Sequence, residues 1–292
     1  MINMYDVIII GSGPAGISTA LYTKRGGLTT LIISKGISSL QKAQKIGNYY
    51  GIDKELSGEQ LYKIGLDQAK KLEVEIVEDE VTQIIYENEF KVITVNSEYA
   101  AKKVVIATGA NRKMPTIKGI KQYEGKGVSY CAVCDAFFFR NKDVAVLGDG
   151  NYAIHEAEIL KPVAKSVTIM TNGKKMTENR NLDVDVLEDE IREFRGTDKI
   201  NEVEFKNNKI KKIDGLFVAE GIATSIDLAR KIGAVIEENN IKVDENMETT
   251  VKGLYACGDC TGGILQISKA VYEGTKAGLS IICLLYTSPS PR

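Results

Sequence analysis

Two glycine-rich turns, set a fixed distance apart, constrain the fold of this chain more than any other feature. Residues 11–16 and 148–153 each follow a run rich in β-branched residues and precede a helical pattern. The second turn begins 137 residues after the first, and Thr171 lies 137 residues after Ser34. Ser34 and Thr171 are the residues that follow the second predicted strand of each repeat. Because the offsets are equal, the repeats share one register and predict the same local fold twice.

Each turn joins a strand to a helix, and another strand follows the helix. The elements predicted are 5–10, 16–24 and 29–33 in the first repeat, and 144–147, 151–160 and 167–170 in the second. A strand, a helix and a strand in succession favour a parallel sheet with a right-handed crossover. The sequence therefore predicts an α/β protein with two Rossmann-like domains, each built on a parallel sheet.

The second domain is predicted to be inserted into the first. A chain of 292 residues is long enough for two domains. Strand 241–243 and segment 253–259 are expected to return to the first sheet, so the chain would cross between domains near Arg112 and Ala234. The first domain would comprise residues 1–112 and 235–282, and the second 113–234.

Composition excludes several classes of function. The chain has 38 Lys+Arg against 39 Asp+Glu, a formal charge of -1, and 43% hydrophobic residues. Neither a basic nucleic-acid footprint nor a stretch long enough to span a membrane is evident. The N-terminus lacks the pattern of a secretory signal, which favours a cytoplasmic protein.

The last ten residues do not continue the pattern before them. Residues 267–282 read as a helix, after which residues 283–292 contain two prolines. This string is typical of translated sequencing-adaptor read-through. We expect residues 283–292 to be a non-native tail, the alternative being a natural disordered end.

The first turn has the features of a dinucleotide-binding site. Its glycines allow close approach of a pyrophosphate to the backbone at a helix N-terminus. The acid that normally accepts the ribose hydroxyls is replaced by Ser34.

The second turn keeps Gly148, Gly150 and Ala153 but is less favourable to a nucleotide. Asp149 adds a negative charge, and only Lys174 and Lys175 offer a cation near the end of the following strand. Nicotinamide dinucleotide binding and an empty relict fold both stay open for this turn.

A pair of cysteines lies between the two turns. Cys131 and Cys134, separated by two residues, can exchange between dithiol and disulfide. A metal site would need four ligands, and the other Cys-x-x-Cys pair, Cys257 and Cys260, is more than 120 residues away. We therefore predict redox chemistry at Cys131 and Cys134 and no metal.

Neighbouring residues bear on the same chemistry. Asp135 follows the second cysteine and could move protons to and from the dithiol. Cys257 is expected to pack as a small residue and Cys260 to approach a helix, with a secondary redox role as the alternative. His155, the only histidine, is expected on a helix and not as a catalytic base.

The chain resembles the low-molecular-weight thioredoxin reductases, which are class II pyridine nucleotide-disulfide oxidoreductases. The motifs that carry the resemblance run in family order through almost the whole chain: residues 11–16, 48–51, 107–109, 131–135, 258–259 and 265–267. The Cys-x-x-Cys-Asp motif inside the second domain separates this family from relatives whose disulfide lies in the first.

The resemblance implies FAD in the first domain and electron transfer from FAD to a Cys131–Cys134 disulfide. Cys134 would lie nearer the flavin, Cys131 would attack the disulfide of thioredoxin or a thioredoxin-like protein, and Asp135 would serve as acid and base. Rotation of the inserted domain and a homodimer are also implied. The residues expected to bind FAD are Gly11, Ser12, Gly13, Pro14, Ala15, Gly16, Ser34, Asn48, Ala107, Thr108, Gly109, Gly258, Asp259, Gln266 and Ile267.

The departures from the family bear on the electron donor. The arginines and histidine of its nicotinamide signature are replaced at Thr171, Asn172, Gly173 and Thr177, and its Gly-Gly-Gln is replaced near residues 38–41. In this the chain resembles the branch that takes electrons from reduced ferredoxin, so the donor is NADPH or ferredoxin. The alternatives are a FAD-binding thiol sensor without turnover and a flavin-dependent oxidase.

Overall fold

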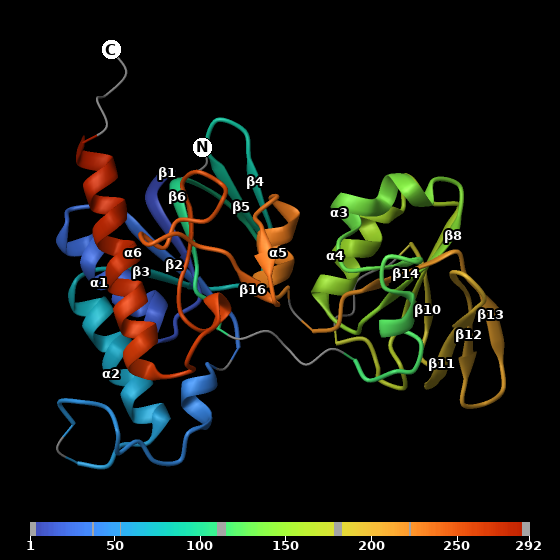
Figure 1. Ribbon diagram of the computed structural model, residues 1–292, viewed down its shortest axis with the longest axis horizontal. Helices are drawn as coiled ribbons and strands as arrows, with labels where there is room; N and C mark the ends of the chain where they lie inside the picture. The colour runs from blue at the N-terminus through green and yellow to red at the C-terminus, as the bar shows by residue number, and fades with distance from the viewer. Residues whose placement is uncertain are drawn as a thin grey trace. The chain divides into compact units, whose positions relative to one another are not determined.

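The computed structural model describes residues 4–36, 38–52, 54–109, 115–177, 183–221 and 223–287. The chain divides into two compact units, Met1–Asn111 with Thr224–Arg292, and Arg112–Ala223. The second is thus inserted into the first, as the sequence predicts (Figure 1).

Unit 1 is built on a mixed sheet with the strand order β3-β2-β1-β6-β5-β4, and β17 pairs with the second half of β6. Strands β3, β2, β1, β6 and β17 are parallel, whereas β4 and β5 form antiparallel pairs. The strands are β1 (Met4–Ile10), β2 (Thr30–Ser34), β3 (Glu75–Glu78), β4 (Val81–Tyr86), β5 (Phe90–Thr94), β6 (Glu98–Ile106) and β17 (Leu254–Ala256).

Unit 1 also contains the long helices α1 (Pro14–Arg25), α2 (Gly58–Lys71) and α6 (Ile267–Thr287) (Figure 1). Helix α1 packs closely on α6, because a Cβ at Gly274 would come within 2.2 Å of the Ala15 carbonyl oxygen. The central strands are buried on both faces, which accounts for their continuous runs of Val and Ile.

Unit 2 contains a parallel sheet, β10-β9-β8-β14-β7, and an antiparallel sheet, β11-β12-β13. Its helices are α3 (Ala132–Asp135) and α4 (Asn151–Leu160), with a 3-10 turn η3 (Ala136–Phe139). The strands are β7 (Val128–Ser129), β8 (Asp143–Leu147), β9 (Ser166–Met170), β10 (Asp185–Leu187), β11 (Ile191–Gly196), β12 (Ile200–Phe205), β13 (Ile210–Lys212) and β14 (Gly215–Val218).

The shared register predicted from the two turns is confirmed. Val7 pairs with Thr30 in β1–β2, and Val144 pairs with Val167 in β8–β9, so both partners are displaced by the same number of residues. The predicted fold class, two Rossmann-like units with parallel sheets, is therefore correct.

Two expectations about the chain between residues 220 and 250 are corrected. Helix α5 (Ser225–Lys231) belongs to unit 1, so the second crossing lies at Ala223 and Thr224 and not near Ala234. A capping box of Thr224 and Asp227 starts α5 there. Segment 241–243 does not join the main sheet, because β16 (Asn240–Ile241) pairs with β15 (Ile236–Glu237). The crossing expected near Arg112 falls outside the described residues.

Helix α6 does not end at Ile282 as expected but continues to Thr287. Leu285 packs against the core of unit 1, and the Tyr286 hydroxyl donates a hydrogen bond to the Gly26 carbonyl oxygen at 2.7 Å. Residues 288–292 of the proposed tail lie outside the described residues. Among the helices that the structure describes, α6 included, none is long and apolar enough to cross a membrane.

Candidate active site

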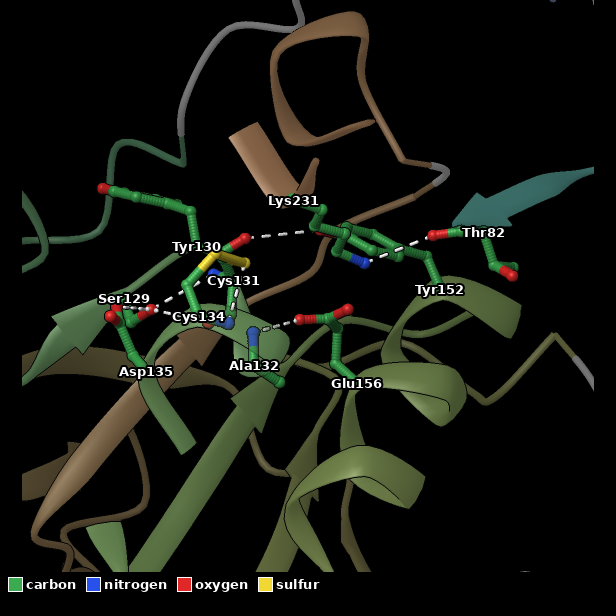
Figure 2. The surroundings of a disulfide bond; sticks show 10 residues. All are labelled: Thr82, Ser129, Tyr130, Cys131, Ala132, Cys134, Asp135, Tyr152, Glu156 and Lys231. Atoms are coloured by element: carbon green, nitrogen blue, oxygen red, sulfur yellow. Dashed lines mark hydrogen bonds between the residues drawn. A yellow bond between two sulfur atoms is a disulfide. The ribbon is translucent and has the colours of Figure 1, made fainter. Parts of the chain in front are cut away.

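The predicted redox pair forms a disulfide at the start of α3. Cys131 is the N-cap of this helix, in an extended conformation with φ −149° and ψ 100°, and its sulfur accepts a hydrogen bond from the Cys134 N–H at 3.2 Å. Cys131 and Cys134 are disulfide-bonded, with their Cα atoms 5.3 Å apart. This agrees with the pairing that the family resemblance implies (Figure 2).

Ser129 links the disulfide to the predicted acid and base. The Cys131 N–H donates to the Ser129 oxygen at 3.1 Å, and the Ser129 hydroxyl donates to Asp135 at 2.6 Å. Figure 2 shows Ser129 and Asp135 on the same side of the sulfur pair. The Asp135 carboxylate is thus fixed beside the backbone that carries Cys131.

A buried carboxyl group from α4 reaches the same loop. The Ala132 N–H donates to Glu156 Oε2 at 2.7 Å, and Glu156 is only 1% exposed (Figure 2). The Tyr152 hydroxyl, from the first turn of α4, donates to the Tyr130 carbonyl oxygen at 3.4 Å. Helix α4 therefore holds the backbone on both sides of Cys131.

The two cysteine residues differ in exposure. Cys134 is exposed and Cys131 is 1% exposed. Close to them along the chain, Phe137 and Phe138 expose 72% and 67% of their surface. Two large aromatic side chains left in solvent form an apolar surface of the kind that contacts protein partners.

Cys257 and Cys260, the second Cys-x-x-Cys pair, are fully buried free thiols in unit 1. The Cys260 thiol donates to the Cys257 carbonyl oxygen at 3.3 Å. Burial raises the pKa of Cys257 to about 12 and also raises the pKa of Cys260. Both are therefore poor nucleophiles near neutral pH, which supports the packing role expected from the sequence.

The contrast between the buried thiols of Cys257 and Cys260 and the exposed Cys283 predicts which cysteines can be alkylated. At pH 8, iodoacetamide is expected to modify the exposed Cys283 of the folded protein and to leave Cys257 and Cys260 unmodified for hours, because burial keeps both thiols protonated and covered. Peptide mass spectrometry before and after denaturation measures the pattern. Rapid modification of Cys260 in the native protein would instead support the secondary redox role.

The residues predicted to bind FAD converge at the carboxyl ends of the parallel strands of unit 1. The first glycine turn follows β1, Ser34 ends β2, residues 107–109 follow β6, and residues 258–259 follow β17. Ligands of open α/β sheets bind at this edge. Asn48 lies in the loop before α2 and donates to the Gln266 side chain, next to the start of α6, at 3.4 Å.

The first glycine turn fits a pyrophosphate. A Cβ at Gly11, where φ is +110°, would lie 2.4 Å from the Ala107 carbonyl oxygen, so only glycine brings these two turns together. Gly13 is the N-cap of α1, and its helix start has neither a side-chain cap nor an acidic residue in the first turn. The positive end of α1 is thus available to an anion. Ser12 also hydrogen-bonds the Tyr62 hydroxyl at 2.7 Å.

A charged network holds the turn that carries Asp259. Glu273 on α6 accepts hydrogen bonds from the Gly258 N–H and the Thr261 hydroxyl, each at 2.8 Å. Lys269 donates to the Gly258 carbonyl oxygen at 2.8 Å and pairs with Glu273 at 3.1 Å. Burial raises the pKa of Asp259, and Lys269 opposes this rise.

The second glycine turn is occupied by the protein's own side chains. Lys174, the cation considered for a phosphate, pairs with Asp149 at 3.3 Å and lies 4.0 Å from Glu220. The Thr177 N–H and hydroxyl both donate to the Asp149 carbonyl oxygen, at 2.8 and 2.9 Å. Two carboxylates against one cation leave this turn unfavourable to a phosphate.

The remaining candidates for chemistry are the metal ligands and His155. Among the residues that the structure describes, no group of three or more His, Cys, Asp and Glu side chains is suited to a metal, and the absence of a metal stays a prediction. His155 lies on α4, as expected. The sequence does not predict the roles of Tyr62, Glu156 and Glu273, because their hydrogen bonds join residues distant in sequence and leave no local pattern. Ser129 is close to Cys131 in the sequence, but a lone serine is no distinctive motif.

Comparisons with known proteins agree with this geometry. The family described as pyridine nucleotide-disulphide oxidoreductase matches residues 5–274. The thioredoxin reductase of Bacillus subtilis (strain 168) is 35% identical over 96% of this chain and 94% of its own length.

Solved structures are also similar. The atypical thioredoxin reductase TRi from Desulfovibrio vulgaris Hildenborough has a TM-score of 0.92 and 35% identity over 97% of this chain and 99% of its own. A ferredoxin-flavin thioredoxin reductase from Clostridium acetobutylicum has a TM-score of 0.74 and 31% identity over 99% of this chain and 100% of its own. The matched family comprises flavin-binding oxidoreductases. This chain belongs to the pyridine nucleotide-disulphide oxidoreductases and, within them, to the thioredoxin reductases.

Proposed function

We propose that this enzyme passes two electrons from a donor, through FAD bound in unit 1, to the Cys131–Cys134 disulfide and on to thioredoxin or a thioredoxin-like protein. The observation that carries the proposal is the disulfide itself, held beside Asp135 in a chain that also has an uncapped glycine turn for a pyrophosphate. FAD would supply a carrier able to take and release an electron pair.

The residues of unit 1 would bind and orient this cofactor. The α1 N-terminus would hold the pyrophosphate, and Ser34, in place of the usual acid, would face the adenosine ribose. Asp259 would bind the ribityl chain, with Gly258 fixed by Glu273 and Lys269. Asn48, Gln266 and Ile267 would lie near the flavin ring.

Thiol exchange would complete the reaction. Two electrons and two protons open the disulfide to two thiols. The Cys131 thiolate then attacks one sulfur of the partner disulfide, and Cys134 displaces the partner dithiol, restoring the original bond. Asp135, held by Ser129, would take up and return the proton. Cys131 is buried, so we propose that the rotation known for the family uncovers it.

The exposed aromatic side chains suggest where the protein substrate binds. Phe137 and Phe138 follow the disulfide in η3 and leave most of their surface in solvent. We propose that they contact the partner around its own disulfide. A homodimer, implied by the family, is part of the same proposal.

The second glycine turn favours a protein donor over NADPH. Asp149 and Glu220 neutralise Lys174, and the positions of the family's arginines hold Thr171, Asn172, Gly173 and Thr177. A solved relative of 31% identity is named a ferredoxin-flavin thioredoxin reductase. We propose reduced ferredoxin as the donor, with NADPH as the second candidate.

An anaerobic donor test separates these candidates. Reduced ferredoxin is expected to bleach the flavin band and support turnover with thioredoxin and a thiol reporter. NADPH at about 0.1 mM is expected to be at least roughly tenfold slower, because Asp149 and Glu220 lie against Lys174 and compete with a phosphate for it. Prompt bleaching by NADPH would reverse the choice of donor. Bleaching without turnover would favour a thiol sensor, and turnover with neither donor would remove the reductase proposal.

A further inference from the structure

We propose that Glu156 is a positioning residue that keeps Cys131 close to Cys134 after the disulfide opens. It acts through the Ala132 N–H, which lies between the two cysteines in sequence and donates to Glu156 Oε2 at 2.7 Å. Through this hydrogen bond Glu156 acts on the backbone between the two cysteines.

The contact is well placed to restrain the loop. Glu156 lies on α4, a ten-residue helix, whereas Ala132 begins the four-residue α3. Ala132 is 0% exposed and Glu156 1% exposed, so water does not compete for their hydrogen bond. A buried N–H that loses its acceptor is costly, and the loop would move to satisfy it elsewhere.

The restraint matters more in the dithiol than in the disulfide. In the oxidised protein the sulfur–sulfur bond itself fixes Cys131 relative to Cys134. Once two electrons and two protons have broken that bond, Cys131 relies on backbone hydrogen bonds. Its N–H donates to Ser129, its carbonyl oxygen accepts from the Asp135 N–H at 3.1 Å, and the next residue, Ala132, is tied to Glu156 on α4. Removing the contact with Glu156 therefore frees the dithiol more than the disulfide.

If Cys131 moves more freely relative to Cys134 in the reduced protein, the effective concentration of one thiol near the other is lower. The equilibrium then shifts from disulfide towards dithiol, and the reduction potential of the pair rises. With Glu156 present, the pair is a stronger reductant and favours electron delivery to a partner disulfide. The inference rests on the proposed redox role of the pair, but the equilibrium can be measured without donor, thioredoxin or turnover.

The test uses the full-length holoprotein, equilibrated anaerobically with mixtures of reduced and oxidised glutathione. Two glutathione thiols supply the electrons and protons that open the disulfide and become one glutathione disulfide. Acid quenching, alkylation and mass spectrometry of the peptide that contains Cys131 and Cys134 give the ratio of dithiol to disulfide. Glu156→Ala is expected to shift the equilibrium about tenfold towards dithiol, or about 30 mV.

Matched variants identify the cause of the shift. Glu156→Gln keeps an oxygen acceptor and is expected to stay within about twofold of the unchanged protein. Glu158→Ala removes an exposed carboxylate from the same helix and is expected to have no effect. Glu156→Met fills similar volume without an oxygen acceptor and repeats the alanine result if the alanine variant does not fold.

Two results would overturn the inference. One is an unchanged equilibrium in a folded variant that lacks the acceptor, Glu156→Ala or Glu156→Met. The other is an equal shift in Glu156→Gln, which would assign the effect to charge and not to the hydrogen bond. Absence of turnover with any donor, alongside the expected shifts, would instead count against the proposed function alone.

Discussion

Replacing Cys134 by serine is expected to lower the rate of thioredoxin reduction by at least about 10³-fold. A single sulfur can neither store an electron pair as a dithiol nor displace a partner that is bound to Cys131 as a mixed disulfide. Steady-state turnover with a thiol reporter measures the loss. The same variant is expected to trap thioredoxin on Cys131, visible as a band that a reductant removes on gel electrophoresis.

Cys283→Ser is the matched control for this experiment. Cys283 is an exposed cysteine on α6 and takes no part in the redox site, so its replacement is expected to leave turnover unchanged. Full activity in Cys134→Ser would contradict the proposed electron path. It would promote the alternative of a flavin-dependent oxidase that passes electrons to oxygen.

A second large effect is expected at the first glycine turn, where Gly16→Ala should weaken flavin binding by roughly 30- to 150-fold. The added Cβ would lie 2.0 Å from the Gly11 carbonyl oxygen, a backbone atom that cannot rotate away. Relieving such a clash by moving α1 costs about 2–3 kcal/mol, and this movement displaces the amides proposed to hold the pyrophosphate. Fluorescence titration of the apoprotein with FAD measures the affinity.

Gly65→Ala on the neighbouring helix α2 controls for the added methyl group. Its Cβ would meet Ile17 at 3.5 Å, an ordinary contact, so flavin affinity is expected to stay within about twofold. Thermal unfolding is expected to shift upwards slightly, because alanine favours a helix over glycine by about 1 kcal/mol. An equal loss of flavin affinity in both variants would contradict the proposal that the first glycine turn binds the cofactor.

The paired strands and their shared register were predictable because their signals are local. A run of β-branched residues, a glycine turn and a helix lie within about thirty residues, and each repeat supplies its own evidence. The Cys131–Cys134 motif and Asp135 are also contiguous in the sequence. Residue identity and spacing were enough to place them at one site.

The parts that were missed depend on contacts between distant segments or on weak boundary signals. Helix α2 begins with a capping box of Ser57 and Gln60, a short pattern that is easily overlooked beside the glycine turns. Helix α5 was assigned to the wrong unit because only its packing against β4 and β16 settles its place. Glu156 and Ala132 are 24 residues apart and share no motif.

The order of segments along the chain has a consequence for biosynthesis. Unit 2 is continuous, from Arg112 to Ala223, and can fold once it has left the ribosome. Unit 1 lacks β17 and α6 until the last part of the chain has been made, and these supply the Gly258 turn and the helix that packs on α1. Nascent protein is therefore expected to form its redox disulfide loop before it can retain a flavin, and flavin binding waits until α6 has been made.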